Sequence, residues 1–252
     1  MRDQPRSLGA HLEELRGRLI WSALAIVAGA VLAGVFHEEV IGALIRPARE
    51  YLSVTNKPIF TEVTEFLGVV VRIAVLGGLV VALPVLAYQV VLFVAPALNP
   101  AERRLALAFV PTATLLFSGG VAFAYFILLP PALRFLLTFG QEIATPMIRI
   151  SGYVSLVVTL VFWIGVVFET PLLMFLLAKL GVVSYRGFAR ARRYLFVGAF
   201  VAGAVITPTF DPLNQTLVAL PLIVLYEVGI FVAWLVRPRE RQATRTARPA
   251  EG

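Results

Sequence analysis

One glutamate lies in the middle of a long apolar stretch. Within residues 153–178, Glu169 is the only Asp, Glu, Lys, Arg or His. The ten residues from Glu169 to Lys179 would span roughly 15 Å of helix, about half of a ~30 Å hydrocarbon core, so the carboxylate belongs near the middle of a membrane. Pro171 cannot donate a hydrogen bond to the carbonyl of Val167, which predicts a kinked helix beside the acid. Such acids cost roughly 2.5 to 3.5 kcal/mol to insert and usually serve a function.

Glu14 lies in a charged stretch that leads into the first apolar run. In residues 11–19, HLEELRGRL, the leucines recur at helical spacing. This pattern predicts an amphipathic helix over residues 8–18 that lies on the membrane before turning into it. Glu14 and Arg18 are four residues apart and can form an ion pair worth only ~0.2–0.5 kcal/mol. The spacing alone fits a solvated charged face as well as a binding role.

Glu102 precedes Arg103 in a short polar loop. It follows the turn at Asn99 and Pro100, so it falls in the first turn of the next helix, where a carboxylate complements the helix dipole. That helix-start role is one interpretation. In the other, Glu14 and Glu102 lie at the same membrane depth and receive the arginines of a ligand, because a guanidinium donates two parallel hydrogen bonds to a carboxylate.

The composition argues against most enzymatic sites. The chain has no cysteine, which excludes disulfides, thiol catalysis and cysteine-based metal sites. His11 and His37 are far apart, and neither has the second histidine four residues away that a helical metal site would need. No phosphate-binding loop or Gly-x-Ser-x-Gly motif is present. We therefore expect a protein that holds no metal or cofactor.

The composition predicts an integral membrane protein, because 59% hydrophobic residues leave too little polar surface for a water-soluble domain. The fold class expected is all-α, with six transmembrane helices. The fifth predicted span is short and must cross with little tilt or in a locally thinned bilayer. The six spans are Leu19–Phe36, Phe66–Val94, Leu105–Pro130, Tyr153–Ala178, Tyr194–Thr207 and Leu213–Val236.

The distribution of Lys and Arg predicts the orientation. The N-terminal lead-in, the 97–104 and 179–193 loops and the tail hold 16 of the 22, which places both termini in the cytoplasm. We expect one membrane domain over residues 1–236, with a retained first span, and a disordered basic tail over 237–252. The tail lacks aromatic residues, so we expect it to attract membrane lipid and not nucleic acid.

Several other features are expected to shape the domain. The first external loop, residues 37–65, should cover one side, with Phe60 and Phe66 as packing anchors. Glu227 is interpreted as a second buried acid with a partner on another helix or subunit. Close helix approach is expected at two glycine pairs, residues 77–78 and 119–120.

Two other function classes use the same residues differently. A proton-coupled small-molecule transporter could use Glu169 and Glu227 as a relay, but we find no internal repeat with broken helices in matching positions. An intramembrane protease is disfavoured because neither histidine lies at membrane depth. The two aspartates, Asp3 and Asp211, do not share a span.

The order and spacing of many short motifs are similar to those of the TatC family, the multispanning receptor subunit of the twin-arginine protein translocase. The resemblance covers nearly the whole chain. It is carried by residues 11–19, Pro84, Tyr88, Gln89, Phe93, Pro96, 102–104, Phe117, Tyr125, Phe126, Phe168, Glu169, Pro171, 192–194, Thr207, Pro208, Asp211, Gln215 and 225–227.

This resemblance implies a concave, glove-like protein, with several helices kinked by proline, that binds signal peptides carrying paired arginines on folded cargo. It also implies that the protein is not an enzyme. Its partners would be the single-span TatB and TatA subunits and further copies of itself, and the proton motive force would drive export across the cytoplasmic (inner) membrane. The roles implied for individual residues are signal-peptide binding by Glu14, Arg16, Glu102 and Arg103, an intramembrane polar wall at Glu169, and partner-helix docking at Thr207, Gln215 and Glu227.

The last external turn departs from the family pattern. The chain has Thr207-Pro208-Thr209-Phe210-Asp211, one residue longer than the Thr-Pro-Pro-Asp usual in the family. The position of Asp211 in that turn relative to Gln215 is therefore expected to differ.

Overall fold

The computed structural model describes residues 8–48, 58–94, 100–140, 147–206 and 212–236 of the 252-residue chain. These residues are almost entirely helical, apart from an isolated bridge between Ile59 and Arg149. The elements are α1 (Leu8–Val35), α2 (His37–Ile45), η1 (Arg46–Ala48), α3 (Glu65–Val94), α4 (Pro100–Phe123), η3 (Ala124–Leu128), α5 (Leu129–Thr138), α6 (Ile150–Phe168), α7 (Thr170–Lys179), α8 (Tyr185–Ile206) and α9 (Pro212–Leu235).

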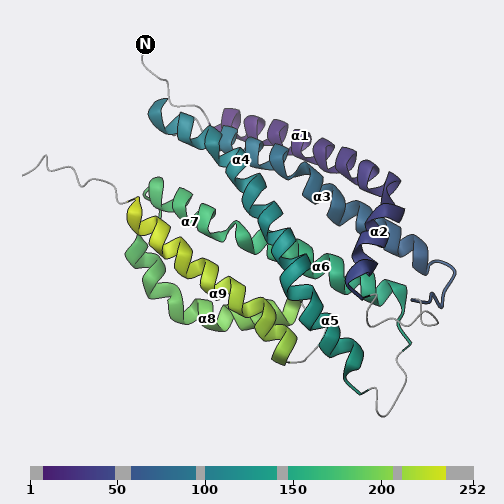
Figure 1. The fold of residues 1–252 in the computed structure, drawn as a ribbon. Coiled ribbons are helices and arrows are strands. Elements are labelled where there is room, and N and C mark those ends of the chain that lie inside the picture. Colours follow the sequence, from purple (N-terminus) through teal and green to yellow (C-terminus); the bar gives the residue numbers. More distant parts are fainter. Residues whose placement is uncertain (1–7, 49–57, 95–99, 141–146, 207–211, 237–252) are drawn as a thin grey trace, which may run out of the picture.

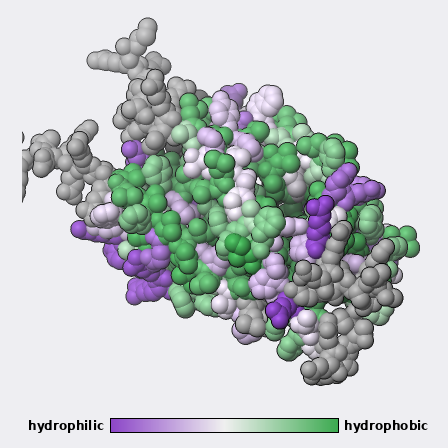
Figure 2. Space-filling view, in the orientation of Figure 1, coloured by the Kyte–Doolittle hydropathy of each residue, from purple (hydrophilic) through white to green (hydrophobic). Residues whose placement is uncertain are grey.

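The helices form an open arrangement (Figure 1). A pair made of α1 and α3 lies on one side, α7, α8 and α9 lie on the other, and α4 with α5 runs diagonally between them. The start of α1 and the end of α9 lie at the same end of the molecule, as expected for an even number of crossings. Figure 2 shows hydrophilic side chains gathered towards the two ends of this face, with a hydrophobic surface between them. This surface pattern is typical of a protein that spans a membrane.

Helix length and hydropathy support five of the six predicted spans in the described part of the chain. These spans are Leu12–Val35, Glu65–Phe93, Leu107–Thr138, Ile150–Lys179 and Gln215–Leu235. The predicted short fifth span lies in α8, whose first turns are rich in arginine and whose apolar part packs beside α9. The protein is thus an all-α, multi-pass membrane protein.

Two predicted boundaries are corrected. The third span continues past Pro130 to Thr138, because its two prolines occupy the first positions of α5, where no intrahelical hydrogen bond is lost. The predicted turn between the lead-in and the first span is wrong, since α1 runs without a break from Leu8 to Val35. At 28 residues it is roughly 42 Å long, so its first turns extend beyond a ~30 Å hydrocarbon core.

The segment predicted as the first external loop is partly helical, since it contains α2 and η1. Tyr125 and Tyr153 donate hydrogen bonds of 2.7 Å each to the carbonyls of Ala43 and Leu44, which anchors the end of α2 to η3 and α6. The predicted packing anchors are wrong. Phe60 is 64% exposed, and Phe66 is 38% exposed with an edge contact to His37.

Glycines allow two close helix crossings. A Cβ atom at Gly78 would lie 2.6 Å from the backbone nitrogen of Ala30, so α1 and α3 meet at van der Waals distance. A Cβ atom at Gly120 would lie 2.8 Å from the ring of Phe168, which brings α4 against α6. The predicted role of Gly119 is wrong, because nothing lies within 4 Å of a Cβ atom there. In the first pair both glycines face α1, since a Cβ atom at Gly77 would lie 2.8 Å from the Cβ atom of Ala33, whereas in the second pair only Gly120 faces its neighbour.

The largest buried cluster joins α2, α3, η3, α5, α6, α8 and α9 near the end that holds α2. Val154, Val157 and Ile164 of α6 are fully buried in it. By contrast, α1 exposes large apolar side chains such as Trp21 and Val31 along much of its length. The central helix α6 therefore holds the two sides together, while α1 depends on its contact with α3.

Candidate functional site

Glu14 lies in the second turn of α1, and Arg18, four residues later, contacts the end of α3. Arg18 donates a short hydrogen bond to the Glu14 carboxylate, as its spacing of four residues predicted. Arg18 also donates a 2.9 Å hydrogen bond to the carbonyl of Leu92 in α3. The Glu14 side chain keeps 26% of its surface exposed. This geometry holds an accessible carboxylate in a defined position against a second helix.

The other residues predicted for this site lie at the same end. Glu102 and Arg103 belong to the first turn of α4, as the Asn-Pro turn predicted, but their side chains lie outside the part of the structure that is described. Arg16 is exposed on α1. The roles of the three residues stay predictions.

Glu169 interrupts the long apolar stretch. α6 ends at Phe168 and α7 begins at Thr170, with Pro171 in the first turn of α7, so the predicted kink is a full break between two helices. Within the described residues, the carboxylate oxygen Oε1 of Glu169 is buried and has no hydrogen-bond partner. A buried polar group of this kind is costly to leave unsatisfied, so the Glu169 oxygen is available to a donor from water or from a bound molecule.

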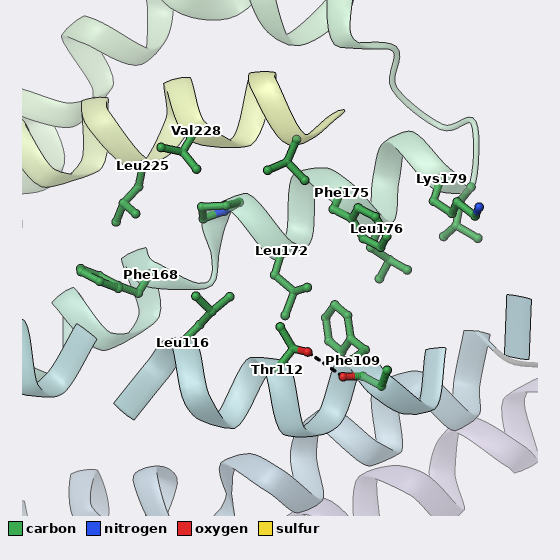
Figure 3. A pocket seen from close by; sticks show the side chains of 14 residues that line it. Phe109, Thr112, Leu116, Phe168, Leu172, Phe175, Leu176, Lys179, Leu225 and Val228 are labelled. Carbon is green, nitrogen blue, oxygen red and sulfur yellow. Dashed lines mark hydrogen bonds between the residues drawn. The ribbon is translucent and has the colours of Figure 1, made fainter. Parts of the chain in front are cut away.

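A groove adjoins this break (Figure 3). It is lined by α4, α6, α7 and α9 and has a volume of about 490 Å³. Phe168 and Pro171, on either side of Glu169, contribute to the lining, and Figure 3 shows Leu116, Leu172 and Phe175 facing the same space. The lining is nearly all apolar, with Thr112 using its hydroxyl to bond the carbonyl of Ala108 in its own helix. Such a surface fits an apolar helix or lipid chains better than a polar small molecule.

The residues predicted to dock partner helices lie on the α8–α9 hairpin. Gln215 donates a 2.7 Å hydrogen bond to the carbonyl of Phe200, and its backbone packs against Gly203. Glu227 forms a 2.6 Å ion pair with Arg192, which confirms an interhelical partner. It is not a buried acid, however, because 46% of its side chain is exposed.

Two of the predicted residues, Thr207 and Asp211, lie outside the described residues. Their roles therefore rest on the sequence. The described neighbours Ile206 and Pro212 end α8 and begin α9, so both residues belong to the connection between the two helices.

A polar cluster that was not predicted from the sequence lies at the opposite end of the molecule. The Glu65 carboxylate, 3% exposed, accepts hydrogen bonds from the backbone N–H and hydroxyl of Thr61, from the N–H and hydroxyl of Ser151 and from Arg149. Arg149 also pairs with Glu62 at 3.3 Å. The bond to Glu65 raises the pKa of the Arg149 guanidinium above its usual value. No sequence signal joins Glu65 to Ser151, because 86 residues separate them.

The described residues hold no group of three or more His, Cys, Asp or Glu side chains that could bind a metal ion. The two candidate sites are a carboxylate held by an arginine at one end of the molecule and an acid beside an apolar groove in the middle.

Comparison with known proteins identifies the architecture. The family model for the Sec-independent protein translocase protein (TatC) matches residues 10–221. The chain is 38% identical over 245 residues to the TatC protein of Carboxydothermus hydrogenoformans, covering 97% of this chain and 100% of that one. It is 35% identical to the chloroplastic protein of Arabidopsis thaliana, covering 93% of this chain and 67% of that one.

A crystal structure of the twin-arginine translocase receptor TatC superposes with a TM-score of 0.81 at 39% identity, covering 90% of this chain and 99% of that chain. Because that fold has six transmembrane helices, α8 counts as the sixth span beside the five found by length and hydropathy. The matches favour a protein translocase subunit over a small-molecule transporter. The chain belongs to the TatC family of Sec-independent protein translocase proteins.

Proposed function

We propose that this protein is the receptor and core subunit of a twin-arginine translocase, which exports folded proteins that carry paired-arginine signal peptides. The observation that carries the proposal is the Glu14 carboxylate, held by Arg18 and through it by the carbonyl of Leu92. A carboxylate held in this way presents its oxygens to a guanidinium with little further loss of side-chain entropy.

Glu102 supplies the second carboxylate of the signal-binding site. Arg18 holds Glu14 against Leu92 near the end of α3, and α4 begins only six residues after α3 ends, so two acids on separate helices would each receive one arginine of the pair. Arg16 and Arg103 act as supports that orient the acids. A lysine pair would bind less well, because an ammonium cannot form the two parallel hydrogen bonds of a guanidinium.

Transport uses a separate part of the molecule. We assign Glu169 and the adjoining groove to the transmembrane helix of a TatA- or TatB-type subunit, since the buried oxygen lacks a partner within the described residues and the groove is apolar. The α8–α9 hairpin, with Thr207, Gln215 and Glu227, is a second docking surface. Because Gln215 and Glu227 already bond within the hairpin, they fix its shape and present its exposed apolar face. Asp211 belongs to the external turn of this hairpin.

The proposed setting is the cytoplasmic membrane, with both termini in the cytoplasm. The arginine-rich start of α8 and the start of α1 lie at one end of the molecule, which the positive-inside rule assigns to the cytoplasm (Figure 1). Further copies of the chain join the receptor complex, and the proton motive force drives export.

Photocrosslinking tests this proposal. A paired-arginine signal peptide should crosslink to probes placed beside Glu14 and Glu102, and Glu14→Ala or Glu102→Ala should lower the yield. A paired-lysine peptide should be captured poorly by the unaltered protein. Unchanged crosslinking in either variant would refute the assignment of that acid. Uptake of a small solute into liposomes that contain the protein would favour the transporter instead.

A further inference from the structure

A polar pocket of about 340 Å³ opens between α3 and α6, at the end opposite the proposed signal site. It is lined by the Glu65 cluster described above and by Gly68, Arg72 and Ser155. The two acids of this pocket lie at the Arg149 end, where Glu62 and Glu65 share that arginine. Two carboxylates and one guanidinium leave this end with an excess of negative charge, so an anion is favoured only at the other end of the pocket, beside Arg72.

Arg72 is in a different situation. Its guanidinium donates a short hydrogen bond to the hydroxyl of Ser155, and among the described residues no carboxylate pairs with it. The side chain is exposed on the outer surface of α3. A guanidinium in a membrane span normally has a counter-charge, because a charged group is expensive to hold beside hydrocarbon.

The depth of Arg72 indicates what that counter-charge is. α3 has 30 residues and is roughly 45 Å long, which exceeds a ~30 Å hydrocarbon core by about five residues at each end. Arg72 is the eighth residue of α3, so its Cα atom lies just inside the hydrocarbon boundary. A long arginine side chain at this depth reaches the level of the lipid phosphates.

The shape of the pocket agrees with a bound headgroup. Gly68 lies four residues before Arg72, on the same face of α3, and nothing lies within 4 Å of a Cβ atom built there. The pocket is thus open above Arg72, and the hydroxyls of Ser151 and Ser155 line its other wall. A phosphate group would find a bidentate donor in Arg72 and a further donor in the hydroxyl of Ser155, whereas the Ser151 hydroxyl already donates to Glu65.

We propose that Arg72, with Ser155, binds the phosphate of an anionic phospholipid in the leaflet opposite the signal-binding end. The lipid occupies the open side of the pocket at Gly68. It adds a contact between α3 and α6 beside the hydrogen bond of Arg72 with Ser155, and it does not depend on the receptor function proposed above.

The test is native mass spectrometry of the full chain purified in detergent, with phosphatidylglycerol and phosphatidylcholine added as competing probes. The unaltered protein should retain phosphatidylglycerol in preference to phosphatidylcholine. Arg72→Gln should lower the retained phosphatidylglycerol by about tenfold or more, since it removes a charge-assisted bidentate contact. Arg134→Gln is the matched control, because Arg134 is an exposed arginine at the same end but outside the pocket, and it should change little.

Gly68→Leu provides a test that leaves Arg72 in place. The larger side chain fills the open side of the pocket without a clash, so it should lower lipid retention while the thermal stability in detergent is kept or raised. This variant, together with Ser155→Ala, decides the question if Arg72→Gln does not fold.

Equal retention of phosphatidylglycerol by the unaltered protein, Arg72→Gln and Gly68→Leu would overturn the proposal. An equal loss in Arg134→Gln would also overturn it, because binding would then depend on net charge alone. Millimolar inorganic phosphate should not displace the lipid. If it does, and if it stabilises the protein as well as the lipid does, the site takes a soluble anion and the lipid assignment is wrong.

Discussion

Glu65 and Glu14 both lie near a membrane boundary, at opposite ends of the molecule, and their surroundings differ. Glu65 is 3% exposed and receives hydrogen bonds from three different residues. Glu14 is 26% exposed and is oriented by one arginine of its own helix. A carboxylate whose oxygens are sealed by the protein's own donors stabilises the fold, whereas an oriented and accessible one can bind a ligand.

The largest effect expected from this comparison is a loss of stability when Glu65, the buried carboxylate, is removed. Glu65→Ala leaves the hydroxyl and N–H of Ser151 and the N–H of Thr61 without their acceptor, so it should lower the free energy of unfolding by about 2–4 kcal/mol. Thermal unfolding in detergent measures this loss. The matched control is Glu62→Ala, which removes a 69% exposed partner of Arg149 and should cost less than about 1 kcal/mol. If both variants lost the same free energy of unfolding, Glu65 would contribute no more to the fold than Glu62 does.

A second prediction concerns Glu169, which combines features of both ends: it is partly buried, yet its Oε1 lacks a hydrogen bond within the described residues. Glu169→Leu removes an unsatisfied polar group, so stability should stay the same or rise by up to about 1 kcal/mol. Export by membrane vesicles should nevertheless fall, while capture of the signal peptide is kept because the capture site lies at another part of the fold. Equal loss of capture and export would contradict this division of labour.

The smallest effect is expected at the exposed ion pair of Arg192 and Glu227. With about half of each side chain exposed, Glu227→Gln should change the free energy of unfolding by less than about 1 kcal/mol. Exchanging the charges, Arg192→Glu with Glu227→Arg, should restore stability in a double-mutant cycle. A loss of several kcal/mol would mean that Glu227 is buried in the working complex by a partner.

The features predicted correctly from the sequence are local ones. The break at Glu169 follows from Pro171 two residues later, and the pair of Glu14 with Arg18 follows from helical spacing. By contrast, the predicted turn before the first span was wrong, because Gly17 alone, at about 1 kcal/mol, does not end a helix that is favoured on both sides.

The features that were missed depend on residues far apart in the chain. A partner for Glu227 on another helix or subunit was predicted, but its identity, Arg192, follows only from the hairpin of α8 and α9. Glu65 meets Ser151 because α3 packs against α6. Similarly, the exposure of Phe60 and Phe66 could not be predicted from their hydrophobicity, since tyrosine hydroxyls and a buried glutamate hold this region instead. Such contacts are properties of the packed fold, and helical spacing carries no information about them.

The claim that Glu14 binds an arginine of the signal peptide in preference to lysine is tested most directly by changing both the receptor and the signal peptide. The affinity of a paired-arginine and a paired-lysine signal peptide would be measured for the unaltered protein and for Glu14→Gln in the same membranes. We expect the lysine peptide to bind the unaltered protein about tenfold more weakly or worse, and this difference to shrink in Glu14→Gln, because the acid that distinguishes the two side chains is gone. An arginine-over-lysine preference that stays the same in Glu14→Gln would contradict the account.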